Sequence, residues 1–89
     1  MNAIVTAVGR DRPGIIAAIC GKLAECNLSI LDISQTILKG NFNMVMIVDI
    51  SQANVSFETA AEGLEALGGE MGLAIHVQRE EIFDAMHRI

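Results

Sequence analysis

The chain has 89 residues, of which 52% are hydrophobic and 3% aromatic, and its formal net charge at pH 7 is -5. A chain of this length forms one compact domain, and its core consists of aliphatic residues and methionine because tryptophan and tyrosine are absent. The acidic charge disfavours nucleic acid and anionic lipid as partners, and no run of about 18 apolar residues predicts a membrane span. We therefore expect a soluble, cytoplasmic protein that binds neither nucleic acid nor a membrane directly.

The first predicted elements are a strand over residues 3–8 and an amphipathic helix from about Pro13 to Cys26. Asp11 stands where a helix cap would stand, and proline is favoured in the first turn because its missing N–H has no partner there. One face of the helix is apolar at three- and four-residue intervals, with Ile16, Ile19, Cys20 and Leu23. Asn27 follows directly and is suited to the left-handed conformation that ends helices.

A hairpin is predicted next, from two β-rich runs over residues 28–38 and 42–50 that are joined by Lys39-Gly40-Asn41. Alternation in the second run places one set of side chains on each face of the strand. The first set is Phe42, Met44, Met46, Val48 and Ile50, and the second is Asn43, Val45, Ile47 and Asp49. Both faces of this strand therefore carry apolar residues.

The remaining elements are a second helix, a last strand and an amphipathic tail. Ser56 is the expected cap of the helix, whose apolar face runs from Phe57 to Met71, and Gly72 is its expected end. Leu73, Ile75 and Val77 alternate with polar or small residues and predict a strand. Residues 80–89 predict a short amphipathic helix with Ile82, Phe83, Met86 and Ile89 on one side.

This order predicts an α+β, ferredoxin-like β-α-β-β-α-β sandwich over residues 1–79, with the C-terminal helix of residues 80–89 packed on the same or a partner subunit. The four strands form an antiparallel sheet, and both main helices lie on one face. The other face would be bare, although its hairpin strands are apolar. We expect the tail, a second copy, or both to cover it, and hence a homodimer or a higher homo-oligomer.

The loop from Val8 to Ile16 has the chemistry of a small-anion or zwitterion site. Free N–H groups at a helix start, with the positive end of the helix dipole behind them, bind carboxylate or phosphate. Arg10 and Arg12 flank this loop and make it locally basic on an acidic chain. The same residues also occur for stability alone, with Asp11 as an ordinary cap and Arg12 as a solvated cation.

Metal and redox chemistry are not predicted. Cys20 and Cys26 lie too far apart along one helix for a disulfide, since about 9 Å of axial rise exceeds the usual Cα separation. His76 and His87 are isolated from each other and from carboxylates at ligand spacing. We expect no metal, no cofactor and no catalytic residue.

Three stretches resemble the ACT domain, a small regulatory module that binds amino acids: Gly9 to Ile16, Leu23-Ala24-Glu25 and Ile30 to Thr36. The tail of residues 80–89 is similar to that of small stand-alone bacterial ACT proteins. The resemblance implies a ligand pocket between the first loop and the start of the second strand, usually completed by a neighbouring copy. The implied ligand-binding residues are Arg10, Asp11, Arg12, Pro13, Gly14, Ile15, Asn27, Leu28 and Ser29. Many family members have Gly and Asn where this chain has Asn27 and Ser29.

The function predicted from these features is that of a regulatory module, not an enzyme. It would sense an amino acid or a related metabolite at a subunit interface and act on an unknown metabolic or transcriptional partner. One alternative is a dimeric protein-interaction adaptor without a ligand. Another is an acylphosphatase-like hydrolase, with Arg12 holding phosphate and Asn43 orienting water. An RNA-recognition fold shares the topology, but Phe42 is the only aromatic residue on the hairpin and the charge is of the wrong sign.

Overall fold

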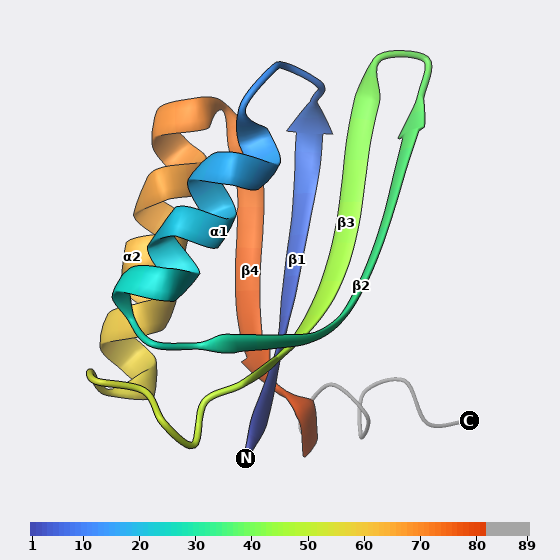
Figure 1. The fold of residues 1–89 in the computed structure, drawn as a ribbon. Helices are drawn as coiled ribbons and strands as arrows, with labels where there is room; N and C mark the ends of the chain where they lie inside the picture. The colour runs from blue at the N-terminus through green and yellow to red at the C-terminus, as the bar shows by residue number, and fades with distance from the viewer. Residues whose placement is uncertain (82–89) are drawn as a thin grey trace.

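The computed structural model describes residues 1–81, which form a four-stranded sheet and two helices. The elements in chain order are β1 (Asn2–Arg10), α1 (Ile15–Glu25), β2 (Ser29–Leu38), β3 (Asn41–Asp49), α2 (Phe57–Met71) and β4 (Leu73–Arg79). All pairings in the sheet are antiparallel, its strand order is β2-β3-β1-β4, and both helices lie on one face (Figure 1). The predicted ferredoxin-like fold is confirmed, whereas nearly all of the predicted C-terminal helix, residues 82–89, lies outside the described residues.

The core lies between the sheet and the two helices. Alternate residues of β1 and β3 point toward the helices, where they meet one row from each helix. This cluster includes Val5, Met44, Met46, Val48, Ile15, Ile19, Leu23 and Leu64, each at most 2% exposed. The predicted alternation of β3 is therefore confirmed, except that the strand ends at Asp49 and Ile50 is only partly buried.

The start of α1 differs from the prediction. The N-cap is Gly14, with a left-handed φ of 86°, and no side chain caps the helix. The backbone N–H of Asp11 donates to the Gly40 carbonyl oxygen at 2.9 Å, so the chain at Asp11 still follows the edge of the sheet. Asp11 is therefore too early to cap the helix, and Pro13 lies in the turn before the helix instead of in its first turn.

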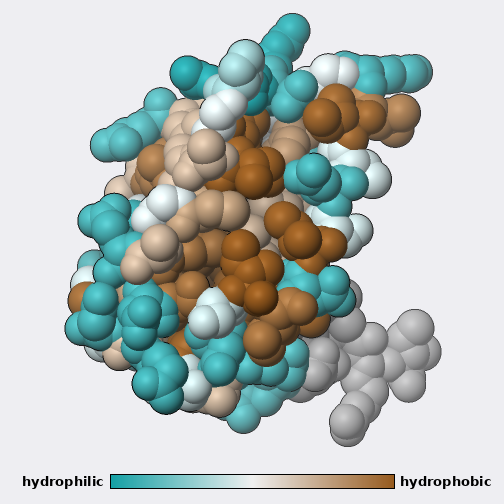
Figure 2. All heavy atoms as spheres, in the orientation of Figure 1, coloured by the Kyte–Doolittle hydropathy of each residue, from teal (hydrophilic) through white to brown (hydrophobic). Residues whose placement is uncertain are grey.

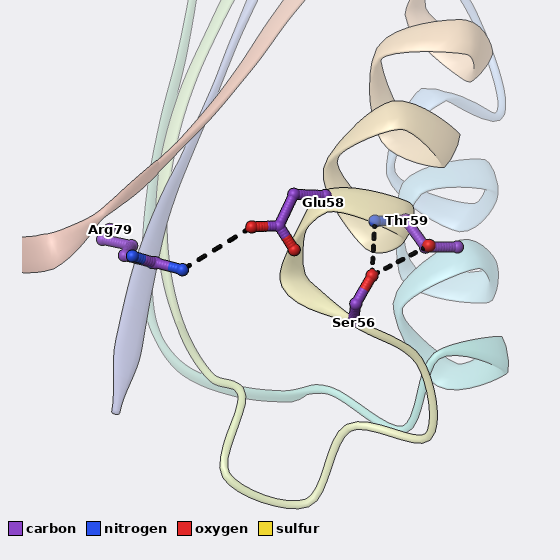
Figure 3. Close-up of polar contacts among 4 residues, drawn as sticks. All are labelled: Ser56, Glu58, Thr59 and Arg79. Atoms are coloured by element: carbon purple, nitrogen blue, oxygen red, sulfur yellow. Dashed lines mark hydrogen bonds and ion pairs between the residues drawn. The ribbon is translucent and has the colours of Figure 1, made fainter.

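The other helix ends agree with the prediction. Asn27 has a φ of 58°, and the next residue, Leu28, donates its N–H to the Leu23 carbonyl oxygen at 2.9 Å. Ser56 caps α2 by accepting a hydrogen bond from the Thr59 N–H at 3.1 Å (Figure 3). Gly72, with a φ of 72°, ends the same helix.

The turn between β2 and β3 is shorter than expected. Lys39 and Gly40 both have positive φ, 53° and 80°, and Asn41 already belongs to β3. Two residues with positive φ form the tight hairpin turn whose twist matches that of the flanking strands. Glycine supplies this conformation at no steric cost, which explains why the turn is placed at Gly40.

Strand β2 is an edge strand that the helices do not cover. All of its residues are exposed, from Ser29 to Leu38. Ile30, Ile33 and Ile37 pair with Val48, Met46 and Phe42, so they lie on the helix side of the sheet, yet they are 41%, 41% and 59% exposed. Figure 2 shows hydrophobic surface over this side of the molecule, next to α1. The bare apolar surface therefore includes the helix side of β2, which the sequence did not reveal.

The structure describes three further features of residues 1–81. Cys20 and Cys26 are unpaired, as predicted. No helix within residues 1–81 combines the length and apolar character needed to cross a membrane. The same residues contain no group of His, Cys, Asp or Glu side chains placed to hold a metal ion.

Candidate functional site

The loop between β1 and α1 is held in place by its neighbours on both sides. Gly9 packs so closely on the end of α2 that a Cβ there would lie 2.9 Å from the Gly72 carbonyl oxygen. Asp11 is tied through its N–H to the hairpin turn at Gly40. The loop is therefore attached to the sheet on one side and to the α2–β4 connection on the other, and its outer residues, from Arg10 to Gly14, remain exposed.

The first turn of α1 presents backbone donors without partners. The Ala18 N–H donates to the Gly14 carbonyl oxygen at 3.0 Å, which is the first bond of the helix. The N–H groups of Ile15, Ile16 and Ala17 have no acceptor among the described residues, and the first turn contains no acidic residue. A Cβ at Gly14 would meet nothing within 4 Å, so space in front of these donors is open. Such a helix start attracts an anion.

The charged side chains around this helix start are not equivalent. Arg12 donates a long hydrogen bond of 3.4 Å to the carbonyl oxygen of Met71, at the negative end of the α2 dipole. The side chains of Arg10 and Asp11 make no hydrogen bond or ion pair within residues 1–81. Ile15 is 2% exposed and part of the core, so only its backbone faces the loop.

The other predicted residues, Asn27 to Ser29, lie at the opposite end of α1. The Asn27 amide donates to the Gln52 carbonyl oxygen at 2.7 Å, and Leu28 is 8% exposed in the core. Ser29 begins β2 and pairs with Asp49. The pKa of Asp49 is lowered by two hydrogen bonds from Ser51 to its carboxylate. The larger effect comes from the Ser51 backbone N–H and the smaller from the Ser51 side chain.

The predicted site is therefore split within one chain. The loop precedes α1 and Asn27 follows it, and a helix of 11 residues is about 16 Å long. Figure 1 shows the loop at the end of the sheet where β2 turns into β3, and the start of β2 at the other end. A molecule of the size of an amino acid cannot touch both groups in one copy.

Several neighbours of the site were not predicted. Met71 and Gly72 form one wall of the loop, through the contacts of Arg12 and Gly9. At the other end, the Asn54 side chain donates to the Glu25 carbonyl oxygen at 2.8 Å and so helps to cap α1. These contacts join residues far apart in the sequence, so no local sequence pattern predicts them.

The two residues assigned to the hydrolase alternative, Arg12 and Asn43, do not lie together in the structure. Asn43 alternates with the buried Phe42 and Met44, so it lies on the sheet face away from the helices. Arg12 reaches the end of α2 on the helix side. The two residues needed to hold phosphate and orient water therefore lie on opposite sides of the sheet. A hollow of about 460 Å³ between α1 and α2 also contains none of the predicted site residues.

The fold and this split site can now be compared with known proteins. The family model described as ACT domain matches residues 2–78. The chain belongs to the ACT domain family. It is 47% identical to a UPF0237 protein of Listeria innocua over the whole of both chains. Among solved structures it is similar to an ACT domain protein from Streptococcus pneumoniae, with 41% identity, a TM-score of 0.80 and 98% of each chain covered.

Two larger regulatory proteins contain the same ACT fold. A protein assigned as a glycine cleavage system transcriptional repressor is 27% identical, with a TM-score of 0.75, over 86% of this chain and 44% of that one. The regulatory subunit of aspartate kinase from Thermus thermophilus is 25% identical, with a TM-score of 0.70, over 89% of this chain and 51% of that one. This ACT domain is therefore similar to domains of regulatory proteins.

Proposed function

We propose that this ACT protein is a regulatory module that binds an amino acid or a related small metabolite at a site shared by two copies. The observation that carries the proposal is the open start of α1, where the N–H groups of Ile15, Ile16 and Ala17 have no partner within residues 1–81. Its regulatory setting is supported by the similarity to the aspartate kinase regulatory subunit and to the repressor.

The chemistry of the loop matches both ends of an α-amino acid. The backbone N–H donors and the dipole of α1 stabilise the α-carboxylate. Arg10 is an exposed cation beside them, without a partner among the described residues. The Asp11 carboxylate is equally exposed and would accept the ammonium group. Gly14 leaves the approach to the backbone open because a side chain would occupy that space.

The second half of the site requires a second copy. In a symmetric dimer with antiparallel β2 edges, the Ser29 end of one strand lies beside the Leu38 end of the other. The loop of each copy lies near its own β2–β3 turn, so it would face Asn27 and Ser29 of the partner copy. The dimer would also cover Ile30, Ile33 and Ile37, which the helices leave exposed on the helix side of β2.

Ligand binding to such a site is coupled to the arrangement of the two copies. A ligand that contacts both copies binds one dimer arrangement more tightly than another, and this difference in affinity shifts the populations. The regulated partner would recognise the favoured arrangement. Regulation of this kind needs no catalytic group in the chain.

The first test is a thermal-shift screen against the twenty amino acids and phosphorylated metabolites. A ligand at about 100 times its Kd adds about 2.7 kcal/mol to the free energy of unfolding. We expect a selective rise in Tm that is lost in Asp11→Ala and reduced in Arg10→Gln. Lys22→Gln is the matched control, because it removes a positive charge far along α1. Flat curves for a folded dimer would instead support the ligand-free adaptor.

The shared site has its own test in mixed dimers. Asp11→Ala damages the loop half and Ser29→Trp fills the strand half, so each variant alone should lose ligand binding. In a mixed dimer one site combines the two intact halves, which restores about a quarter of all sites after subunit exchange. A site contained within one chain would not be restored.

Ile33→Lys on the β2 edge should yield a monomer by sedimentation, and a dimer that persists would contradict the proposed interface.

A further inference from the structure

Strand β2 forms one edge of the described sheet, and its backbone groups point alternately toward β3 and toward the free side (Figure 1). In a hairpin with a two-residue turn, the two flanking residues, here Leu38 and Asn41, direct their backbone groups at each other. Every second residue before Leu38 does the same toward β3. The N–H and C=O groups of Ile33, Gln35 and Ile37 therefore point to the free side of β2.

The Asp32 side chain takes up the first of these groups. Its carboxylate Oδ1 accepts a hydrogen bond from the Ile33 N–H at 2.9 Å, which agrees with this N–H pointing away from β3. Just before it, the pairing of β2 with β3 shifts register between Ile30 and Asp32, which marks a bulge. A bulge and a charged side chain are features with which edge strands resist pairing. The part of the edge that is open to pairing is therefore limited to Gln35 and Ile37.

A second copy has few registers in which to pair with this edge, because outward-pointing residues must face one another. If Gln35 faces its own counterpart, Ile33 must pair as well, and the partner strand displaces the Asp32 carboxylate in both copies. If Gln35 faces Ile37 of the partner copy, both residues pair and Asp32 keeps its bond. In this register Thr36 faces its own counterpart, and the partner's hairpin turn begins opposite Ile33. A register centred on Ile37 would pair that residue alone.

The side chains also favour the register centred on Thr36. The two threonines would form a non-hydrogen-bonded pair, in which side chains come closest and threonine hydroxyls bond to each other. On the helix side, Ile37, which is 59% exposed, would gain Gln35 of the partner copy as a neighbour. The register centred on Gln35 would instead place the Asp32 charge against the apolar Leu38 of the partner copy.

We propose that Asp32 sets the register of the β2 interface, and that two copies pair through residues 34–38 with Thr36 on the two-fold axis. This inference rests on the proposed dimer and specifies its contacts. The Ser29 end of each strand then extends past the partner's hairpin turn, at the end of the sheet where the partner's β1–α1 loop lies (Figure 1). Asp32 acts as a positioning residue, because it selects how the two halves of the site meet.

Disulfide cross-linking measures this register directly. In a chain that carries Cys20→Ala and Cys26→Ala, cysteine replaces Gln35, Thr36 or Ile37 one at a time, and oxidised dimers are quantified by non-reducing electrophoresis. The two Thr36 Cα atoms would be about 4.5 Å apart across the axis, and those of Gln35 or Ile37 about 9 Å from their counterparts. A disulfide needs about 4.4–6.8 Å between Cα atoms, so Thr36→Cys should cross-link and the other two variants should remain monomers on the gel.

The role of Asp32 is tested by adding Asp32→Ala or Asp32→Asn to the Gln35→Cys and Thr36→Cys chains. Alanine frees the Ile33 N–H, so the main disulfide should move from position 36 to position 35. Asparagine keeps a side-chain oxygen as the acceptor and should leave the disulfide at position 36. An unchanged preference for position 36 in Asp32→Ala would show that Asp32 does not set the register.

The remaining outcomes separate this proposal from the proposed function. With Asp32 present, a main disulfide at Gln35→Cys would overturn the register but keep the β2 dimer and its shared site. No disulfide in any variant that is folded by circular dichroism would overturn the register and the β2 interface together, whereas ligand binding within one chain would still be seen as a thermal shift. If removal of the native thiols unfolds the chain, Cys20 and Cys26, which are unpaired, are retained, and peptide mass spectrometry locates the disulfide.

Discussion

Gly68 and Gly69 are adjacent glycines in α2 for which alanine should have opposite effects. In a helix, alanine is favoured over glycine by about 1 kcal/mol, because glycine loses more backbone freedom on folding. Gly69 is exposed, and a Cβ there would meet nothing within 4 Å. Gly69→Ala should therefore raise the free energy of unfolding by up to about 1 kcal/mol, or the Tm by about 4–8 °C.

Gly68 lies on the buried side of the helix, where α2 packs on β4. A Cβ at this position would lie 2.8 Å from the Leu73 carbonyl oxygen and 2.8 Å from Ile75 Cγ1. The Leu73 oxygen is a backbone atom that cannot move aside alone, so we place the cost at the upper end of overpacking, about 3 kcal/mol. After the gain in helix propensity of about 1 kcal/mol, Gly68→Ala should lose about 2 kcal/mol.

Urea unfolding of the wild type and of both variants, at one protein concentration, measures this difference. The two alanine variants should differ by about 3 kcal/mol although they stand side by side in the sequence. Equal or greater stability of Gly68→Ala than of the wild type would refute the reasoning that close approach of α2 to β4 requires glycine. A ferredoxin-like sheet with a wider α2–β4 spacing would give that result.

Three further predictions concern local features. Ser56→Ala should lower the free energy of unfolding by about 1 kcal/mol in urea titrations, because the Thr59 N–H loses its acceptor. Gly14→Ala should cost about 1–2 kcal/mol, because the left-handed backbone strains any residue with a Cβ; unchanged stability would contradict the φ of 86°. Asp49→Asn should be less stable than wild type at pH 7, and the difference should disappear as the pH falls below about 4, through the lowered pKa of Asp49; a pH-independent difference would exclude ionisation as its cause.

The element order and most helix ends were predictable because they depend on neighbouring residues. The alternation of Phe42, Met44 and Met46 identified the buried face of β3, since side chains of a strand alternate between faces. Asn27, Ser56 and Gly72 marked helix ends through backbone and side-chain preferences that act within a few residues. Here, local chemistry and the tertiary fold favour the same conformation.

The start of α1 shows where this local reasoning fails. Asp11 and Pro13 have the right chemistry for a helix start, but the hydrogen bond from Asp11 to Gly40 keeps the chain on the sheet. Gly40 is 29 residues away in the sequence, so no local pattern contains this contact. The helix begins at Ile15 behind Gly14, and this later start leaves its first N–H groups without a capping side chain.

The amino-acid sequence by itself determined the ferredoxin-like element order, the faces of the strands and the residues of the candidate loop. It did so because periodicity and capping are properties of short segments. Only the tertiary structure decided that β2 is bare on both faces and that Gly68 permits α2 to approach β4. These features depend on how far the helices extend over the sheet, and that distance is set by packing between segments that are remote in the chain.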